Sequence, residues 1–316
     1  MQDGSRKAII AAFFANLGIA VAKFVGFLLT GSAGLLAEAG HSIADTGNQG
    51  LLMLGGRRGK RPADAAHPFG YGPERYFWSF VVALVLFSMG GLFALYEGIQ
   101  KVLHPHAIES AGIAYVILGL SILLESFSLR TAVKEANHVR GHRTWWEFIR
   151  TAKAPELPVV LLEDFGAEIG LACALIGLTL AEVTGNARWD AVGSIAIGML
   201  LICIAMVLAV EMKGLLIGEA ASDDDLEALI GSINDTDEVN TLIHLRTMHL
   251  SPDQLLVAAK VDYHHDLTVA ELAAAIDRTE ANIRTAVPIA TTIYLEPDIR
   301  RGTLEATDGE LAGPTG

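Results

Sequence analysis

Six apolar stretches, each long enough to cross a lipid bilayer as a helix, occupy the first two thirds of the chain. A membrane-spanning helix needs about 20 mostly apolar residues, because a backbone in hydrocarbon must satisfy its own hydrogen bonds. With 52% hydrophobic residues, the chain is more apolar than most soluble proteins. The expected spans are residues 8–30, 33–55, 76–103, 110–130, 158–184 and 188–213.

The pattern changes after Lys213 and predicts a domain outside the membrane. Helical periodicity and strand-like alternation follow one another in the order α-β-β-α-β, which is typical of a small two-layer α+β domain. The expected elements are a helix at 223–234 with Ser222 as its N-cap, strands at 241–250 and 254–265, a helix at 268–287 and a strand at 291–297. We expect residues 1–215 to form an α-helical membrane domain, 216–299 the second domain, and 300–316 a disordered acidic tail.

Charge and cysteine content exclude several classes of function. From Glu219 onward the chain holds 19 of its 36 acidic and 6 of its 23 basic residues, so the whole net charge of −13 belongs to the last third. Such an acidic domain argues against nucleic acid as a partner. The two cysteines, Cys173 and Cys203, lie inside apolar stretches and cannot build a disulfide framework or a thiolate metal cluster.

The loops between spans predict the orientation of the chain. Residues 55–75 and 134–157 are rich in arginine and lysine, whereas the loops on the opposite side hold few of either. By the positive-inside rule, both termini of this multi-pass protein lie in the cytoplasm, as for a protein of a bacterial inner membrane. The N-terminal apolar stretch is too long for a signal peptide, so we interpret it as the first span.

A polar stripe interrupts the second span. Glu38, His41, Asp45 and Asn48 recur at helical spacing and therefore share one face of the helix. Ionisable groups at the centre of a membrane helix cost about 2.5–3.5 kcal/mol each on insertion scales. A stripe of this kind therefore indicates a functional site.

The fifth span offers a matching pair of ligands. Asp164 and Glu168 stand four residues apart, as His41 and Asp45 do in the second span. Two such pairs on facing helices supply four ligands, and imidazole with carboxylates suits Zn²⁺, Mn²⁺, Fe²⁺ or Co²⁺. A single buried histidine or aspartate, in contrast, often only pairs across helices, and Lys23 is available for that.

Other polar residues of the spans are assigned supporting roles. We expect Glu38, Asn48 and Glu163 to orient the ligands or pack the helices. For Asn16, Glu125 and Asp190 we expect hydrogen bonds between helices or contact with water.

Several motifs together resemble the cation diffusion facilitator family. The motifs are GSAGLLAEAGHSIADTGNQ at 31–49, RPADAAHPFGYGPERY at 61–76, LLEDFGAEIGL at 161–171, WDAVGSIAIG at 189–198 and HLRTMHLSPDQLLVAAKV at 244–261. The resemblance covers residues 8–299 and is greatest to the branch that contains zinc transporter 9. It implies a homodimer of six-helix protomers in the lipid bilayer, each with a cytoplasmic ferredoxin-like domain.

The resemblance also implies an activity and a site. Members of this family export divalent cations from the cytoplasm in exchange for protons, so zinc is a transported substrate and no permanently bound cofactor is expected. The site lies between helices 2 and 5. His41 and Asp45 match its helix 2 pair, and Asp164 matches the second member of its helix 5 pair.

The sequence departs from this pattern at one ligand. The first member of the helix 5 pair falls at Val160, which cannot bind a metal. Glu168, one turn beyond Asp164, or the neighbouring Glu163 would then complete the site.

Two secondary metal sites of the family are incomplete here. Asp64 and His67 match two ligands of a zinc site in the loop between helices 2 and 3, but Tyr71 occupies the position of a third. In the C-terminal domain, Tyr294 and Glu296 stand where a histidine and an aspartate occur in well-known members. The loop site stays open, and the domain site is not expected in its usual form.

Two rival classes of function are weighed against transport. An intramembrane enzyme would need a catalytic motif such as H-E-x-x-H, and an ATP-driven pump would need a phosphate-binding loop; the sequence has neither. A metal-binding regulatory protein without flux stays open because of Val160.

Overall fold

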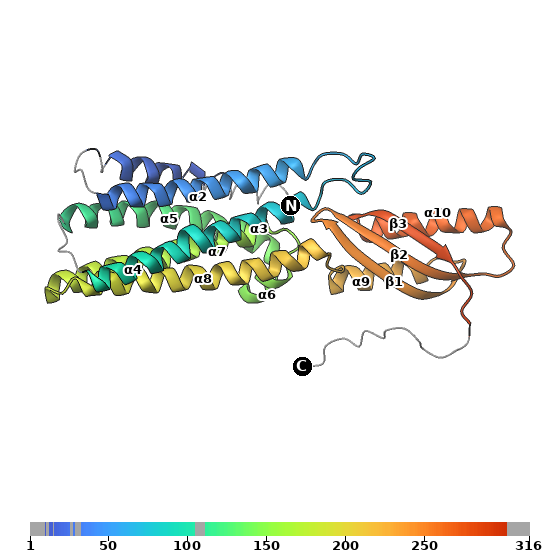
Figure 1. The fold of residues 1–316 in the computed structure, drawn as a ribbon. Coiled ribbons are helices and arrows are strands. Elements are labelled where there is room, and N and C mark those ends of the chain that lie inside the picture. The colour runs from blue at the N-terminus through green and yellow to red at the C-terminus, as the bar shows by residue number, and fades with distance from the viewer. Residues whose placement is uncertain are drawn as a thin grey trace. The chain divides into compact units, whose positions relative to one another are not determined.

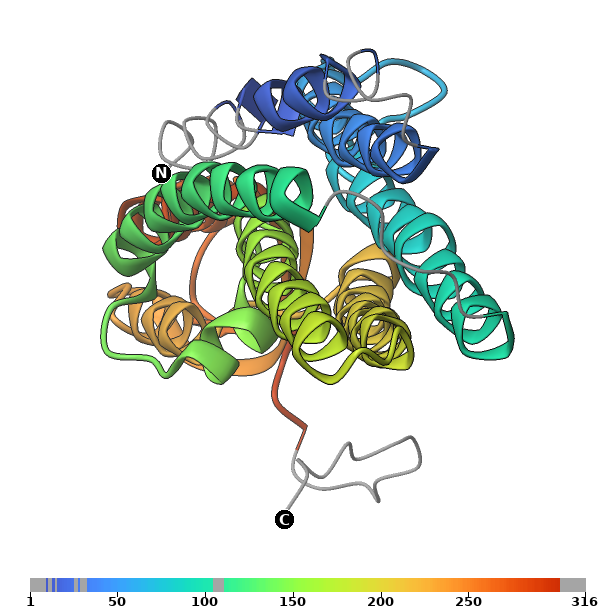
Figure 2. The ribbon, with the colours of Figure 1, turned by 90° about the vertical axis from the view of Figure 1, so that its left-hand side faces the viewer.

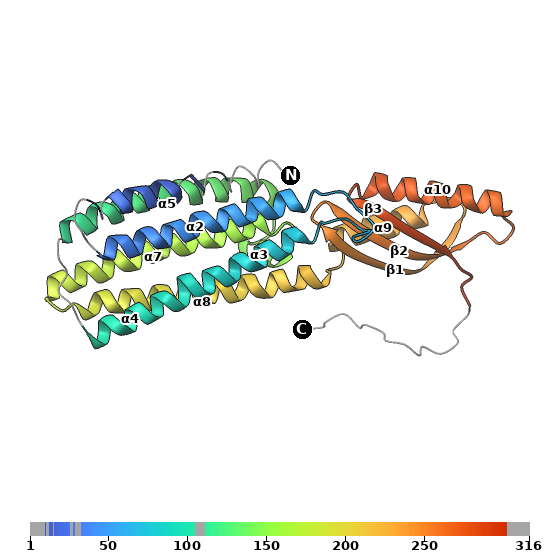
Figure 3. The same ribbon diagram turned by 45° about the horizontal axis from the view of Figure 1, so that its top comes forward.

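The computed structural model describes residues 10, 13–14, 16–25, 28, 33–104 and 111–301, and for residues 33–41, 44 and 111 it describes the backbone alone. The chain divides between Gly218 and Glu219 into two compact units. The described part of the first is helical, and the second combines helices with a sheet (Figures 1 and 3).

Long helices build the first unit, as the apolar stretches predict. They are α2 (Ala33–Arg58), α3 (Glu74–Val85), the π-helix η1 (Leu86–Leu92), α4 (Phe93–Leu103), α5 (Ala111–Arg140), α6 (Trp145–Thr151), α7 (Glu156–Thr184) and α8 (Arg188–Ile217). The elements α3, η1 and α4 continue one another as a single rod over Glu74–Leu103.

Three helices of the described chain are long and apolar enough to cross a membrane by length and composition alone, namely Glu74–Leu103, Gly112–Arg140 and Arg188–Ile217. Helices α2 and α7 are also long, with 26 and 29 residues, but carry the polar residues noted above. The first expected span lies partly outside the described residues, which are helical over 16–25.

Helix α5 continues ten residues past its expected end at residue 130, and the short helix α6 was not predicted. Hydropathy marks where the apolar stretch stops, whereas the helix itself runs on to Gly141, whose φ of 62° favours glycine. The end of a span and the end of its helix are therefore different positions here.

The two sides of α5 differ sharply in exposure. Val116, Leu123 and Phe127 are 71%, 70% and 63% exposed, whereas the opposite edge of the helix is buried against the bundle. Exposed apolar side chains of this size in one band are suited to contact with lipid.

Glycines bring α4 and α8 into backbone contact. A Cβ atom added to Gly98 would lie 2.9 Å from the backbone nitrogen of Ile195, and one added to Gly198 would lie 2.7 Å from that of Leu95. Small residues allow this approach in membrane bundles, where van der Waals packing replaces the hydrophobic effect. Figure 2 shows the bundle from its end, with α7 between α5 and α8.

The second unit has the predicted order of elements. Helix α9 (Asp223–Asn234) is followed by β1 (Val239–Ser251), β2 (Gln254–Tyr263), α10 (Val269–Ala286) and β3 (Ala290–Pro297). The sheet has the order β1-β2-β3, in which β1 and β2 are antiparallel and β2 and β3 are parallel. Because parallel neighbours need a crossover, α10 connects β2 to β3.

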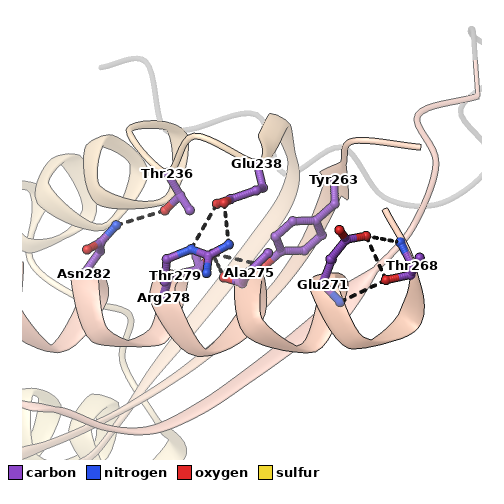
Figure 4. A network of polar contacts seen from close by, with 9 residues as sticks. All are labelled: Thr236, Glu238, Tyr263, Thr268, Glu271, Ala275, Arg278, Thr279 and Asn282. Carbon is purple, nitrogen blue, oxygen red and sulfur yellow. Dashed lines mark hydrogen bonds and ion pairs between the residues drawn. The ribbon is translucent and has the colours of Figure 1, made fainter. Parts of the chain in front are cut away.

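Capping residues fix both helices of this unit. Ser222 caps α9 and accepts a hydrogen bond from the Asp225 amide, as predicted. At α10, Thr268 and Glu271 form a capping box, in which each side chain accepts from the backbone N–H of the other residue (Figure 4).

Further along α10, polar contacts bind the helix to the rest of the unit. Arg278 pairs with Glu238, Asn282 donates to the Thr236 hydroxyl, and the Tyr263 hydroxyl donates to Thr279 (Figure 4). These contacts connect α10 with the end of β2 and with the turn between α9 and β1.

We expect Thr268→Ala to loosen the start of α10. Loss of an N-cap costs about 1 kcal/mol because a backbone donor loses its partner. Hydrogen exchange on the full chain should show faster exchange in the first turn of α10. In contrast, Thr285→Ala, inside the same helix, should leave that turn unchanged; equal protection in both variants would contradict the role of the cap.

The same cap predicts a dependence on pH. Hydrogen bonds from the Thr268 backbone N–H and hydroxyl hold the pKa of Glu271 below its ordinary 4.5. A lowered pKa stabilises the fold above the ordinary value and loses that effect as the pH falls through the lowered one. Between about pH 5 and about pH 3, protection of the first turn, corrected for intrinsic rates, should fall in the wild type. It should change little in Glu271→Gln, and a parallel fall in both proteins would refute this assignment.

Candidate functional site

A cavity of about 170 Å³ lies inside the helical unit. Its described wall comes from residues of 16–25, α2, η1, α4, α5, α7 and α8. Its polar and charged lining residues are Asn16, Lys23, Ser42, Asp45, Glu97, Lys101, Ser121, Glu125, Glu163, Asp164 and Ser194. The cavity therefore has a largely apolar wall into which several charged and polar side chains are set.

Two of the carboxylates that line this cavity belong to predicted ligands on different helices. Asp45 comes from α2 and Asp164 from α7. Asp164 is 1% exposed, and its Oδ2 accepts a hydrogen bond of 2.7 Å from the Ser128 hydroxyl of α5. The backbone of α2 places His41 one turn before Asp45, but the side chains of His41 and Glu38 lie outside the described residues.

A buried lysine supplies positive charge to the cavity wall. Lys23 is 5% exposed, and its Nζ donates to the Ser42 hydroxyl of α2 at 3.0 Å. At the other end of the lining, Lys101 pairs with Glu97 at 3.3 Å and with Asp190 at 3.2 Å. The charge on Lys101 is thus compensated by its own neighbours.

Two amides of α2 hold Glu163 of α7. Asn48 Nδ2 donates to Oε1 at 3.2 Å, and Gln49 Nε2 donates to Oε2 at 2.8 Å. All three residues are at most 5% exposed. A carboxylate held at both oxygens fixes α2 against α7 beside Asp164.

The sequence analysis predicted that Glu168 or Glu163 supplies the ligand that is missing at Val160. Val160 itself is fully buried in the apolar core. Glu168 accepts a hydrogen bond from the Ser126 hydroxyl at 3.0 Å and is not among the residues that line the cavity. Its neighbour Ala167 does line it, and successive residues of a helix point about 100° apart.

The loop after α2 forms a compact turn around Asp64. The Oδ1 atom of Asp64 accepts from the backbone N–H groups of Ala66 at 3.0 Å and His67 at 2.8 Å, and Oδ2 accepts from the Tyr71 hydroxyl at 2.8 Å. The Tyr71 hydrogen bond, followed by the backbone ones, lowers the pKa of Asp64, and the same bond raises the pKa of Tyr71. Asp64 and His67 are thus together, 3.7 Å apart, but Asp64 already has protein partners.

Among the described side chains, no group of three histidine, cysteine, aspartate or glutamate residues is arranged to hold a metal ion. In the second unit, Glu296 pairs with Lys260 at 3.1 Å, Tyr294 is exposed, and His265 lies 3.0 Å from Asp262. These side chains contact different partners.

Sequence reasoning missed Gln49 and Ser128. Both are buried polar residues that contact an acid of α7. The sequence did contain a pattern that could have indicated each residue. Gln49 follows Asn48 as a second amide in an apolar helix, and Ser128 lies one helical turn from Glu125. Serine is common in membrane helices, however, so its position alone does not reveal a partner.

The chain belongs to the cation efflux family of metal transporters. Residues 9–217 match the cation efflux transmembrane domain, and residues 221–298 match the cation efflux protein cytoplasmic domain. The protein is accordingly integral to a membrane. The resemblance to the cation diffusion facilitators and to their zinc transporter 9 branch is confirmed.

Two groups of curated relatives illustrate this similarity. The human proton-coupled zinc antiporter SLC30A9, mitochondrial, is 30% identical over 262 residues, which are 82% of this chain and 46% of the relative. Metal tolerance protein C4 of Arabidopsis thaliana is 30% identical over 267 residues, 84% of this chain and 58% of the relative. The chain thus spans about half the length of the curated relatives it matches.

We expect Gln49→Leu to destabilise the helical unit. The substitution leaves Oε2 of Glu163 buried without its donor, which costs about 1–3 kcal/mol. Thermal unfolding of the full chain in detergent should show a lower midpoint. The double variant Gln49→Leu with Glu163→Leu should recover part of the loss, because it removes both polar partners; an undiminished midpoint for Gln49→Leu alone would argue against the amide clamp.

Proposed function

We propose that the protein exports a divalent cation, zinc first, by antiport against protons. The transport site takes His41 and Asp45 from α2 and Asp164 from α7, with Glu168 or Glu163 as further acids of the site. One observation carries this proposal: Asp45 and Asp164, from two helices, line the same internal cavity. Carboxylates gathered around one cavity of a membrane bundle are suited to a divalent cation.

Competition between metal and protons would couple the two fluxes. Metal binds neutral histidine and ionised carboxylates, so binding releases protons and proton binding releases metal. Histidine titrates close to neutral pH, which makes His41 sensitive to the gradients that cells maintain. In an alternating-access cycle, metal enters the site from the cytoplasm and protons enter it from the other side.

Zinc leads among the cations because some of the relatives, such as human SLC30A9, are named as zinc antiporters. The donor set has one imidazole and otherwise oxygen atoms, which also suits Mn²⁺, Fe²⁺ and Co²⁺. Flux measured with each cation in turn distinguishes these cases.

The same proposal includes topology and assembly. The membrane domain comprises residues 1–215 with six spans and both termini on the cytoplasmic side, followed by the ferredoxin-like domain 216–299 and the tail 300–316. Two copies associate as a homodimer, in keeping with the match to the cytoplasmic domain of the family. In the loop, the existing hydrogen bonds of Asp64 support a turn-forming role over a second metal site with His67.

The second candidate function is a metal-binding regulator without flux. The observation that favours it is Val160, an apolar residue at a ligand position of the family. Such a protein would bind the cation but would not release it across the membrane.

We expect Asp164→Asn to abolish transport, because the variant keeps the shape of the side chain but loses its charge. Full-length protein in sealed vesicles with an imposed proton gradient should accumulate Zn²⁺, and Asp164→Asn should reduce the initial rate by at least about tenfold. Glu182→Gln, an acid of the same helix that pairs with Tyr115, serves as the matched control and should transport normally.

Equal rates for Asp164→Asn and wild type would remove Asp164 from the site. Absence of flux for every cation, with metal binding intact, would favour the regulator.

A further inference from the structure

One edge of α5 is polar and buried inside the bundle. Ser121, Glu125 and Ser128 follow one another at spacings of four and three residues and are 3%, 6% and 1% exposed. Residues with this spacing share one face of a helix. Ser121 and Glu125 line the cavity, and Ser128 contacts Asp164 of α7.

Glu125 is an acid without a hydrogen-bond partner at one of its oxygens. Its Oε2 is buried and receives no hydrogen bond from the described residues. Buried polar atoms in folded proteins nearly always have partners, so an unpartnered carboxylate oxygen beside a cavity points to a ligand that completes it.

The contacts between α5 and α7 place Glu125 close to Asp164. Ser128 donates to Asp164, and Ser126 donates to Glu168, so the two helices run antiparallel with residues 125–128 beside 164–168. Glu125 lies one turn from Ser128 on the same edge, which is about 4.5 Å along the helix axis. Figure 2 shows α5 alongside α7.

The other acids of α7 close to Glu125 differ from it in their hydrogen-bond partners or in their position relative to the cavity. Both oxygens of Glu163 accept hydrogen bonds from the amides of α2. Glu168 accepts a hydrogen bond from Ser126 at Oε1, and its Oε2 is buried without a partner among the described residues, but Glu168 does not line the cavity. Of these three acids, Glu125 alone combines a cavity-lining position with an oxygen that has no partner among the described residues.

We propose that Glu125 is a ligand of the transported cation and adds, from α5, a ligand to a site in which Val160 provides none. The site then draws ligands from α2, α5 and α7 instead of from two helices. Because no three of the described side chains are arranged to hold a metal in this structure, binding requires Asp45, Glu125 and Asp164 to close around the cation. This inference rests on the proposed function, because it adds a ligand to the cation site assigned to Asp45 and Asp164. A glutamate oxygen is an ordinary ligand for Zn²⁺ and its neighbours among the divalent metals.

Cobalt binding to the purified full chain tests this assignment. Co²⁺ reports its own ligands through its visible absorption, and titration in detergent gives its affinity. We expect Glu125→Gln to weaken Co²⁺ binding by at least about tenfold and to change the spectrum. Glu135→Gln, an acid of the same helix ten residues further on, is the matched control and should bind as the wild type does.

A conservative variant separates ligation from folding. Glu125→Asp keeps the carboxylate and should retain measurable binding with an altered spectrum, whereas thermal unfolding of Glu125→Gln should occur no lower than in the wild type, because it removes a buried charge. A Glu125→Gln protein that binds and transports normally, while Asp164→Asn does neither, would overturn the inference and leave the proposed function intact. Normal binding and flux in Asp164→Asn would overturn both.

Discussion

Burial of carboxylates among apolar helices is the constraint on which the helical unit depends. Asp164, Glu163 and Glu125 are each at most 6% exposed, and burying such a group is unfavourable unless it is hydrogen-bonded, paired or neutralised. The bundle meets this cost in different ways, with a hydroxyl for Asp164 and two amides for Glu163. These contacts join α5 to α7 and α2 to α7, so the polar groups also set the positions of the helices.

The opposite side of the bundle has a complementary role. Backbone contact at Gly98 and Gly198 holds α4 close to α8, and this packing needs no polar group. The π-helix η1 lies in the same rod as α4, and two of its residues, Leu86 and Gly90, line the cavity. Short π-helical segments are frequent at functional sites, because the extra residue per turn redirects the side chains that follow. One wall of the cavity is therefore fixed by tight apolar packing and another by buried hydrogen bonds.

Much of this architecture follows from patterns that act over a few residues. Apolar length predicted the long helices, and local signals predicted the α-β-β-α-β order and the Ser222 cap. The ends of helices were less predictable: α5 continues past its apolar stretch, because helix formation does not require apolar side chains. The matched pairs of expected ligands drew attention to α2 and α7, and one member of each pair, Asp45 and Asp164, does reach one cavity.

The spacing of residues along one helix does not reveal how that helix is rotated about its own axis within the bundle. Spacing alone made Glu168 equivalent to Asp45, yet α7 is turned so that Ala167, Gly170 and Ala174 line the cavity. No second acid or histidine stands one helical turn from Glu125 on α5, so no pair of ligands marked it. Its significance depends on the contacts between α5 and α7, which join residues 36 and 42 positions apart in the sequence.

In the proposed cation site, Val160 stands where the family resemblance implies a ligand of helix 5, so other residues must supply that ligand. Helix α7 contributes two acids to the cavity lining, Asp164 and Glu163. Both carboxylate oxygens of Glu163 accept hydrogen bonds from amides of α2. A cation bound by Asp45, Asp164 and a carboxylate of α5 would have mostly oxygen ligands, which discriminate less strongly than imidazole or thiolate between zinc and its neighbours among the divalent metals. Selectivity would then depend on the geometry that the three helices impose.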